Sequence, residues 1–191
     1  ASYINYVHRY SWGVIKPFLL QDGVIDEEQV GWLDGLFGLS YGLGQFPGGL
    51  ADHLKEQVGD RECATSVFFS GNQDFPGDAG RVEWAVAWPL WSDGSYSWYC
   101  NTIPTPDGGT HEAGLRAALV KGIRAFGDLV GQKKAKDITA DAIMTSSEIM
   151  LSVFIRDPQF QSQTKDRLTS PDAARLVENA VRDHFDHYLT D

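Results

Sequence analysis

The sequence contains few cysteines and few cations. Its 191 residues include only Cys63 and Cys100, which have neither metal-ligand spacing nor the number that a disulfide framework needs. We therefore expect a reducing, cytoplasmic environment. Sixteen Lys and Arg against 26 Asp and Glu give a net charge of −10. This balance excludes a surface that is basic overall and made for nucleic acid, but it leaves room for a local basic patch.

The chain also lacks the composition of a disordered, collagen-like or low-complexity protein. Hydrophobic residues make up 42% and aromatic residues 12% of it, which is enough for a real core. Its length suits one domain, or one domain with an appendage. We find no internal repeat.

The N-terminal part has no short uncharged core followed by a small-residue cleavage site, so it does not look like a signal peptide. Residues 30–50 carry one charge, Asp34, and many glycines. A membrane helix needs ~20 apolar residues, so this stretch fits a bilayer span and a glycine-rich buried segment about equally.

Residues 1–53 resemble the first two membrane helices of a major facilitator transporter. The resemblance is carried by HRYSWGVIKPFLL, the acidic DEEQ and GWLDGLFGLSYGLGQFPGGLADHL. The basic residues expected after GGLAD are missing, so it stops near His53. We treat residues 1–45 as a separate apolar, helical segment, foreign to the rest or membrane-like, and expect a domain over residues 46–191.

Two β-prone runs open that domain. Residues 82–91 alternate large apolar residues with Glu83, Ala85 and Ala87, which is typical of a strand with one buried face. The turn Ser92-Asp93-Gly94 leads to a second run over residues 96–103, and we expect the two to form a hairpin.

A helix, a strand and a second helix follow. Leucines and other apolar residues recur at helical spacing from Thr110, the expected N-cap, to Val130. Residues 150–155 form an apolar strand candidate. Ser170 as N-cap and Pro171 as first helical residue start the last helix. The order strand–strand–helix–strand–helix predicts an α/β fold, a two-layer α+β sandwich.

Three polar segments are candidates for chemistry. From Arg116 to Lys136, six basic residues and one acid give a local charge of +5, which suits phosphate contacts or simply a solvated helix face. Gly108-Gly109-Thr110-His111 places two glycines before a helix start, where an anion can bind. Gln163-Thr164-Lys165 offers an amide and a cation in a polar loop, although a surface turn explains it equally well.

Two other ideas rest on histidines. His111 beside Glu112 has the groups for acid–base work, but no nucleophile is marked out near it. His184 and His187 lie three apart on the last helix, and surface or capping roles explain them better than a metal does. We therefore expect no metal site.

YCNTIPTPDGGTHEAGLRAAL (99–119) and LSVFIRDPQFQSQTKDRLTSPDAARLVENAV (151–181) resemble the second domain of bacterial type IIA DNA topoisomerase B subunits. The likeness is greater to topoisomerase IV than to DNA gyrase and runs from about Phe46 to Asp191. It implies a transducer domain with a fold like domain 2 of ribosomal protein S5. Such a domain links an ATP-binding domain to the DNA-cleaving core.

The resemblance also implies roles for residues. Gln163 and Lys165 are expected to contact the γ-phosphate of ATP bound in the preceding domain. Arg116 matches an arginine that faces the DNA-transport cavity, and Lys121 and Arg124 extend its basic surface. Gly108, Gly109, Thr110 and His111 match a signature loop with a structural role.

The family's ATP pocket, its magnesium site and its DNA-cleaving residues are not found in this sequence. ATP and Mg²⁺ are therefore expected only in the full-length subunit, with DNA, the A-type subunit and the missing ATPase domain as partners. The chain alone is expected to be inactive. Two alternatives stay open: a membrane-anchored or transporter-derived chain that carries an S5-like domain, and a stand-alone DNA-binding module.

Overall fold

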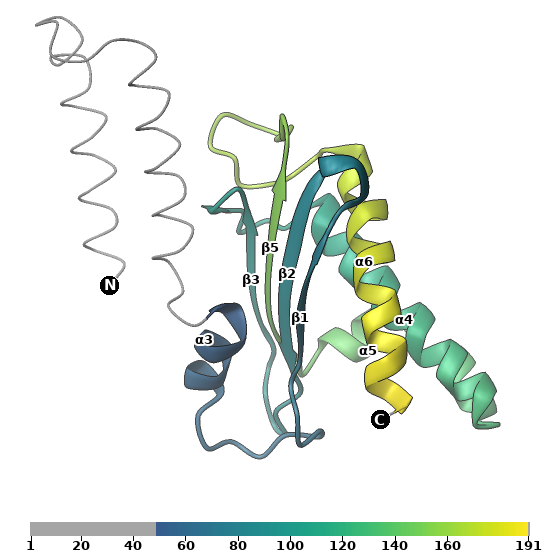
Figure 1. Cartoon of the computed structure of the whole chain (residues 1–191). Helices are drawn as coiled ribbons and strands as arrows, with labels where there is room; N and C mark the ends of the chain where they lie inside the picture. The colour runs from purple at the N-terminus through teal and green to yellow at the C-terminus, as the bar shows by residue number, and fades with distance from the viewer. Residues whose placement is uncertain (1–48, 191) are drawn as a thin grey trace, which may run out of the picture. The chain divides into compact units, whose positions relative to one another are not determined.

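The computed structural model describes residues 49–190, which form one mixed sheet with helices on both faces (Figure 1). The strands are β1 (Phe69–Asp74), β2 (Gly80–Ala87), β3 (Ser95–Cys100), β4 (Ile103–Pro104) and β5 (Glu148–Ile155). The α-helices are α3 (Gly49–Val58), α4 (Thr110–Leu129), α5 (Ala140–Met144) and α6 (Pro171–Thr190), and the short 3-10 helices are η1 (Pro76–Asp78) and η2 (Lys133–Asp137).

The sheet has the strand order β1-β2-β5-β3-β4, so the predicted hairpin is wrong. Strand β5 lies between the two runs and pairs antiparallel with β2 over its whole length and parallel with β3. Its first six residues, from Glu148 to Val153, are all buried. A strand that is buried on both faces belongs at the centre of a sheet, and it therefore displaces the local hairpin partner.

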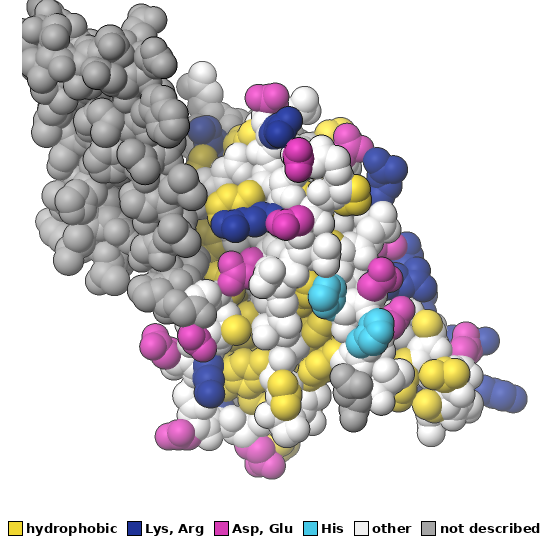
Figure 2. All heavy atoms as spheres, viewed as in Figure 1, with side chains coloured by type: hydrophobic (Ala, Val, Ile, Leu, Met, Phe, Trp, Pro, Cys, Tyr) yellow, Lys and Arg dark blue, Asp and Glu magenta, His cyan; other side chains and the backbone are white. Residues whose placement is uncertain are grey.

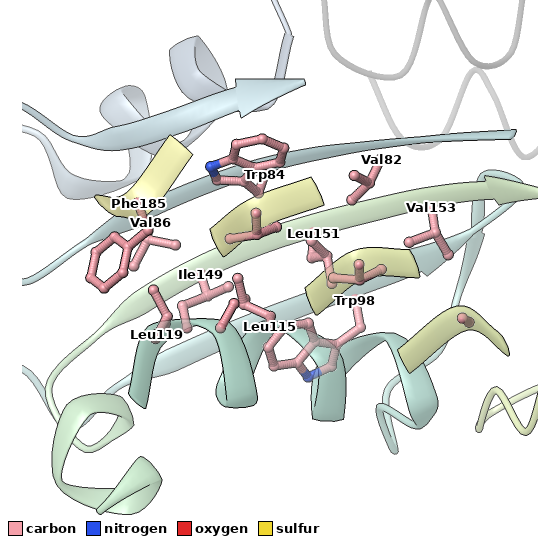
Figure 3. Close-up of a cluster of buried hydrophobic side chains, with 14 of the residues drawn as sticks. Val82, Trp84, Val86, Trp98, Leu115, Leu119, Ile149, Leu151, Val153 and Phe185 are labelled. Carbon is pink, nitrogen blue, oxygen red and sulfur yellow. The ribbon is translucent and has the colours of Figure 1, made fainter. Parts of the chain in front are cut away.

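The core lies between the sheet and helices α4 and α6. Figure 3 shows side chains from β2, β3 and β5 gathered against these helices, as the alternation in residues 82–91 predicted. Trp84, Leu115 and Leu119 have no exposed surface, and Phe185 of α6 is 1% exposed. This packing confirms the predicted α/β fold, although α3 adds a helix on the other face of the sheet.

Helix α3, which we did not predict, packs against β2 and β5 and buries Leu50, Leu54 and Val58. Glu83 alternates with the core-facing Val82 and Trp84, and its carboxylate accepts a 2.8 Å hydrogen bond from the backbone N–H of Leu50. The α3 helix therefore covers the opposite face of the sheet, and a carboxylate caps its positive end.

Beyond α3, the buried Glu148 carboxylate accepts hydrogen bonds from Arg61, Gln57 and Ser92. The Arg61 Nη2–Glu148 Oε2 distance is 2.9 Å. A buried carboxylate needs such partners because its desolvation is costly. The segment that follows α3 is thus fixed to the start of the central strand.

Residues 1–48, which hold most of the transporter-like stretch and the predicted boundary between residues 45 and 46, lie outside the described residues. The part of that likeness that is described, residues 49–53, is the first half of α3. None of the helices within residues 49–190 has the length and apolar character needed to cross a bilayer.

Both long helices occur where the sequence predicted them. Helix α6 begins at Pro171, and the Ser170 hydroxyl before it accepts a 2.8 Å hydrogen bond from the Gln159 N–H. Helix α4 begins at Thr110, but its N-cap is Gly109 and not Thr110. The N-cap is therefore the second of the two glycines that precede the helix.

Candidate nucleotide-contacting loop and basic helix

Two loops meet at the end of the sheet where helices α4 and α6 begin (Figure 1). One is the glycine loop, residues 105–109, which leads into α4. The other is the polar loop, residues 160–169, which is part of the connection between β5 and α6. The two loops are far apart in the sequence, and the fold brings them into backbone contact.

Backbone hydrogen bonds join the two loops at their bases. Asp107 N donates to Asp166 O at 2.9 Å, Leu168 N donates to Gly108 O at 3.0 Å, and Thr110 N donates to Leu168 O at 3.0 Å. Gly109 and Leu168 form a parallel bridge. Because Leu168 is only 1% exposed, this short ladder is anchored in the core.

The contact between the loops requires glycine at position 109, and the backbone angle at position 108 also favours glycine. Gly109 has φ 134°, and a Cβ there would overlap the carbonyl oxygen of Leu168. Gly108 has φ 64°, and a Cβ there would overlap the Glu112 carboxylate. L-residues with a side chain rarely adopt these backbone angles. The close approach of the two loops therefore depends on glycine at position 109.

His111 is fully buried in the first turn of α4. Its Nε2 lies 3.1 Å from Thr105 Oγ1, and its ring meets Trp98 edge-on at 6.2 Å. Burial lowers the pKa of His111 to about 4, so the imidazole is neutral at pH 7. Within the described residues, neither His111 Nδ1 nor Thr110 Oγ1 has a hydrogen-bond partner. A neutral, enclosed imidazole fits a packing role better than acid–base chemistry.

The polar loop presents its tip to solvent. Residues 161–165 are exposed, and Lys165 has φ 61°, a left-handed conformation that is unusual for a lysine. Lys165 N donates to Ser162 O at 3.1 Å, and Thr164 Oγ1 contacts both Ser162 Oγ and the Asp166 carboxylate. These hydrogen bonds form a compact turn that fixes Thr164, and Gln163 and Lys165 are its neighbours in the sequence.

The side chain of Lys165 keeps its charge available. Its Nζ lies 5.7 Å from the centre of the Phe160 ring, a cation–π contact. Among residues 49–190, no carboxylate lies within ion-pairing distance of it, and no side-chain hydrogen bond holds Gln163. An exposed ammonium beside an amide is a suitable pair of donors for a phosphate.

The basic helix residues behave differently. Arg116 Nη2 lies 2.7 Å from Asp141 and Nη1 lies 3.7 Å from Glu112. Lys121 pairs with Glu178 of α6, although half of its side chain remains exposed. Both charges are thus compensated within the fold.

Arg124 and the lysines after α4 retain more free charge. Arg124 donates from Nε and Nη2 to the Ile138 carbonyl, at 3.1 and 2.7 Å, so its charge meets no carboxylate there. Lys136 pairs with Asp128 at 3.1 Å. For Lys133 and Lys134, which are exposed, the described part of the chain provides no ion-pair partner. The available positive charge therefore lies toward the end of α4 and in η2.

The two histidines of α6 do not gather into a metal site. His184 Nε2 lies 3.2 Å from Gln73 Oε1, and its ring meets Trp84 at 5.1 Å. His187 Nδ1 lies 2.7 Å from the Asp183 carbonyl oxygen. Figure 2 shows histidine side chains near acidic and basic ones on the face that it presents. Across residues 49–190, no three His, Cys, Asp or Glu side chains are placed to hold a metal.

Three residues of the site were missed in the sequence. Arg167 Nη1 donates to the Asp107 carbonyl at 2.7 Å, Leu168 carries the ladder, and Thr105 contacts His111. The only available signal was that Arg167-Leu168 closely follows the Gln-Thr-Lys motif. The pairing of the two loops is a tertiary contact, which no local pattern encodes. Burial raises the pKa of the Cys100 thiol to about 12, so this thiol is protonated at pH 7.

Comparison with known proteins gives a consistent result. The protein-family model described as DNA gyrase B matches residues 49–191. The B subunit of DNA topoisomerase 4 from Bartonella bacilliformis is 51% identical over 144 residues, covering 75% of this chain and 21% of the relative. The corresponding protein of Caulobacter vibrioides is 46% identical over 149 residues, covering 76% and 21%. This chain thus spans about a fifth of the length of these relatives.

Solved structures agree on the fold. The topoisomerase IV ATP-binding domain of Francisella tularensis, in complex with a small-molecule inhibitor, has a TM-score of 0.64 at 27% identity. The match covers 76% of this chain and 38% of that one. The 43K ATPase domain of Thermus thermophilus gyrase B, in complex with an aminocoumarin, has a TM-score of 0.65 at 23% identity and covers 75% and 38%.

Proposed function

Since the chain belongs to the DNA gyrase B family, we propose that residues 49–191 are the transducer part of a type II DNA topoisomerase B subunit. In this role the domain couples ATP binding and hydrolysis in a preceding domain to DNA strand passage. The observation that carries the proposal is the polar loop: Lys165 is exposed, has no carboxylate partner among residues 49–190, and stands on a base fixed to α4.

In the longer subunit, Gln163 and Lys165 reach the γ-phosphate of ATP. ATP supplies the phosphoryl group and Mg²⁺ neutralises part of its charge; both are bound mainly by the preceding domain. A lysine ammonium placed at the γ-phosphate stabilises the charge that develops during transfer. ADP offers Lys165 no such partner, so the loop distinguishes the two nucleotides.

The second part of the proposal concerns DNA. The cations best placed for phosphate contacts are Arg124, Lys133 and Lys134, because Arg116 and Lys121 are already compensated by carboxylates. They lie along one helix and the 3-10 helix after it. A DNA contact here depends on the duplex backbone and not on base sequence. The A-type subunit is the other partner that this function requires.

A chimera tests the proposal. Residues 49–191 replace the matching segment of the Bartonella relative, and ATP turnover is measured with DNA and the A-type subunit present. Lys165→Ala should lower kcat by roughly 100-fold, the usual effect of removing one charge-stabilising donor. Lys55→Ala, an exposed lysine of α3, is the matched control and should leave kcat unchanged. Equal turnover in the Lys165→Ala and control chimeras, or no turnover in the unsubstituted chimera, would contradict the proposed function.

A further inference from the structure

We infer that Arg167 is a positioning residue, which fixes the polar loop to the glycine loop so that Lys165 is held at the γ-phosphate. The inference rests on the proposed function and assigns a role to a side chain outside the Gln-Thr-Lys motif. Arg167 itself makes no contact with the phosphate.

The guanidinium of Arg167 contacts the glycine loop. Arg167 is exposed and lies two residues from Lys165, yet its Nη1 donates to the main-chain oxygen of Asp107 at 2.7 Å. An exposed arginine ordinarily extends into solvent or pairs with a carboxylate. Among residues 49–190, no carboxylate lies within ion-pairing distance of Arg167. Its charge is thus used to hold a turn of the neighbouring loop.

Backbone hydrogen bonds join the two loops on both sides of Arg167. The backbone of Asp166 accepts from Asp107, and the backbone of Leu168 bonds to Gly108 and Thr110. Arg167 O also accepts a 3.0 Å hydrogen bond from Gln161 N, which closes the loop on itself. Arg167 is therefore bound to the glycine loop through its side chain and to the other arm of the polar loop through its backbone.

The tip of the polar loop lies beyond these backbone hydrogen bonds. Residues 161–165 are exposed and have only local hydrogen bonds beyond that closing bond, so the ladder and Arg167 fix where the tip stands. A displacement of about 1 Å at a reacting centre can cost roughly 100-fold in rate. Loss of the Arg167 bond should therefore act on turnover through Lys165.

The test uses the same chimera with DNA and the A-type subunit. Arg167→Ala should lower kcat by roughly 10- to 100-fold and raise KM for ATP by a smaller factor, because Lys165 contacts the γ-phosphate in bound ATP and interacts with it more strongly in the transition state. Arg167→Lys keeps one donor on a flexible stem and should recover part of the loss. The matched control is Arg175→Ala, an exposed arginine of α6 that pairs with Asp172 at 3.6 Å.

A double substitution separates positioning from general damage. If Arg167 acts through Lys165, the variant that carries both Lys165→Ala and Arg167→Ala should turn over no more slowly than Lys165→Ala alone. Additive losses, or an Arg167→Ala chimera with full turnover, would overturn the inference while leaving the effect of Lys165→Ala intact. If Lys165→Ala itself has no effect, the proposed function fails first.

Discussion

The polar loop and helix α4 hold their charged side chains in different ways. In the loop, backbone hydrogen bonds and Arg167 fix the base, and Lys165 at the tip contacts the ring of Phe160. In α4, Arg116 and Lys121 are bound to Asp141 and Glu178. The loop therefore keeps its cation available, whereas the middle of the helix does not.

The difference shows that a basic sequence is not the same as a basic surface. The +5 charge of residues 116–136 counts side chains whose acidic partners lie elsewhere in the chain, at Glu112, Asp141 and Glu178. Lys165, in a segment of mixed charge, is the better candidate for an incoming phosphate. Substitutions and changes of pH and salt can test this contrast, from the largest expected effect to the smallest.

The backbone contact between the loops should be the most sensitive element. Gly109→Ala forces an L-residue to φ 134° and places a methyl group on the Leu168 carbonyl, so we expect a loss of about 3 kcal/mol of unfolding free energy. Gly131→Ala is the matched control, because Gly131 also has a positive φ (75°) but has open space around it, and its loss should be about 1 kcal/mol. Urea denaturation measures the unfolding free energy of both variants. Similar losses would mean that the close approach of Gly109 to Leu168 adds nothing to the cost of the positive φ.

His111 should make stability depend on pH. Its pKa is about 4 in the folded protein and about 6.5 when unfolded, so the unfolded chain takes up a proton first as pH falls. Neutral His111 thus contributes stability that is fully present above pH 6.5 and is lost as pH falls toward 4. The loss is about 3 kcal/mol over this range.

The check is to compare urea denaturation of the wild type, His111→Gln and His187→Gln at pH 7 and pH 4.5. His111→Gln should remove most of this pH-dependent part of the unfolding free energy. This holds even if the substitution also lowers stability at pH 7. His187→Gln, at an exposed position of α6, is the control for the replacement of a histidine. An identical pH dependence in all three proteins would show that His111 is not buried in its neutral form.

DNA binding should depend on the uncompensated lysines. The double variant Lys133→Ala, Lys134→Ala should reduce the slope of log affinity against log salt by about 2, one for each lost phosphate contact. Lys121→Ala should leave the slope nearly unchanged, because Lys121 is paired with Glu178. Titration of a fluorescent duplex at several salt concentrations measures both. A slope change on Lys121→Ala alone would reverse the assignment.

The smallest effect should be on stability at Lys121. Its ion pair with Glu178 joins α4 to α6. The Lys121 side chain is 52% exposed, so solvent screens the pair. Lys121→Ala should cost about 0.5 kcal/mol of unfolding free energy. Thermal denaturation at low and high salt should show that even this small difference shrinks with salt. A loss above about 2 kcal/mol would mean that this ion pair is a major stabilising contact.

Sequence reasoning predicted the elements with strong periodicity. Helices α4 and α6 and the strand candidates in β2, β3 and β5 follow from apolar spacing and from the Ser170-Pro171 start signal. Strand β1, with the sequence FSGNQD, has no alternation of its own and is a strand because it pairs with β2. The hairpin prediction was wrong because nothing local indicates that β5 enters between β2 and β3.

The candidate site was predicted in its parts and not in its assembly. The glycine loop and the Gln-Thr-Lys loop were recognisable as motifs, but their backbone ladder joins residues such as Gly109 and Leu168 that are far apart in sequence. The ion pairs of Arg116 and Lys121 also depend on tertiary structure. Conformational demands of single residues, such as φ 61° at Lys165, became visible only in the folded chain.

The most direct test of the account is the chemical accessibility of Lys165 in the chimera. The rate of labelling by an amine-reactive reagent is measured with a non-hydrolysable ATP analogue, with ADP and without nucleotide, using Lys55 as the internal reference. We predict that the analogue alone protects Lys165, because only a γ-phosphate engages its ammonium. Equal labelling of Lys165 with the analogue and with ADP would contradict the assignment of this loop to the nucleotide.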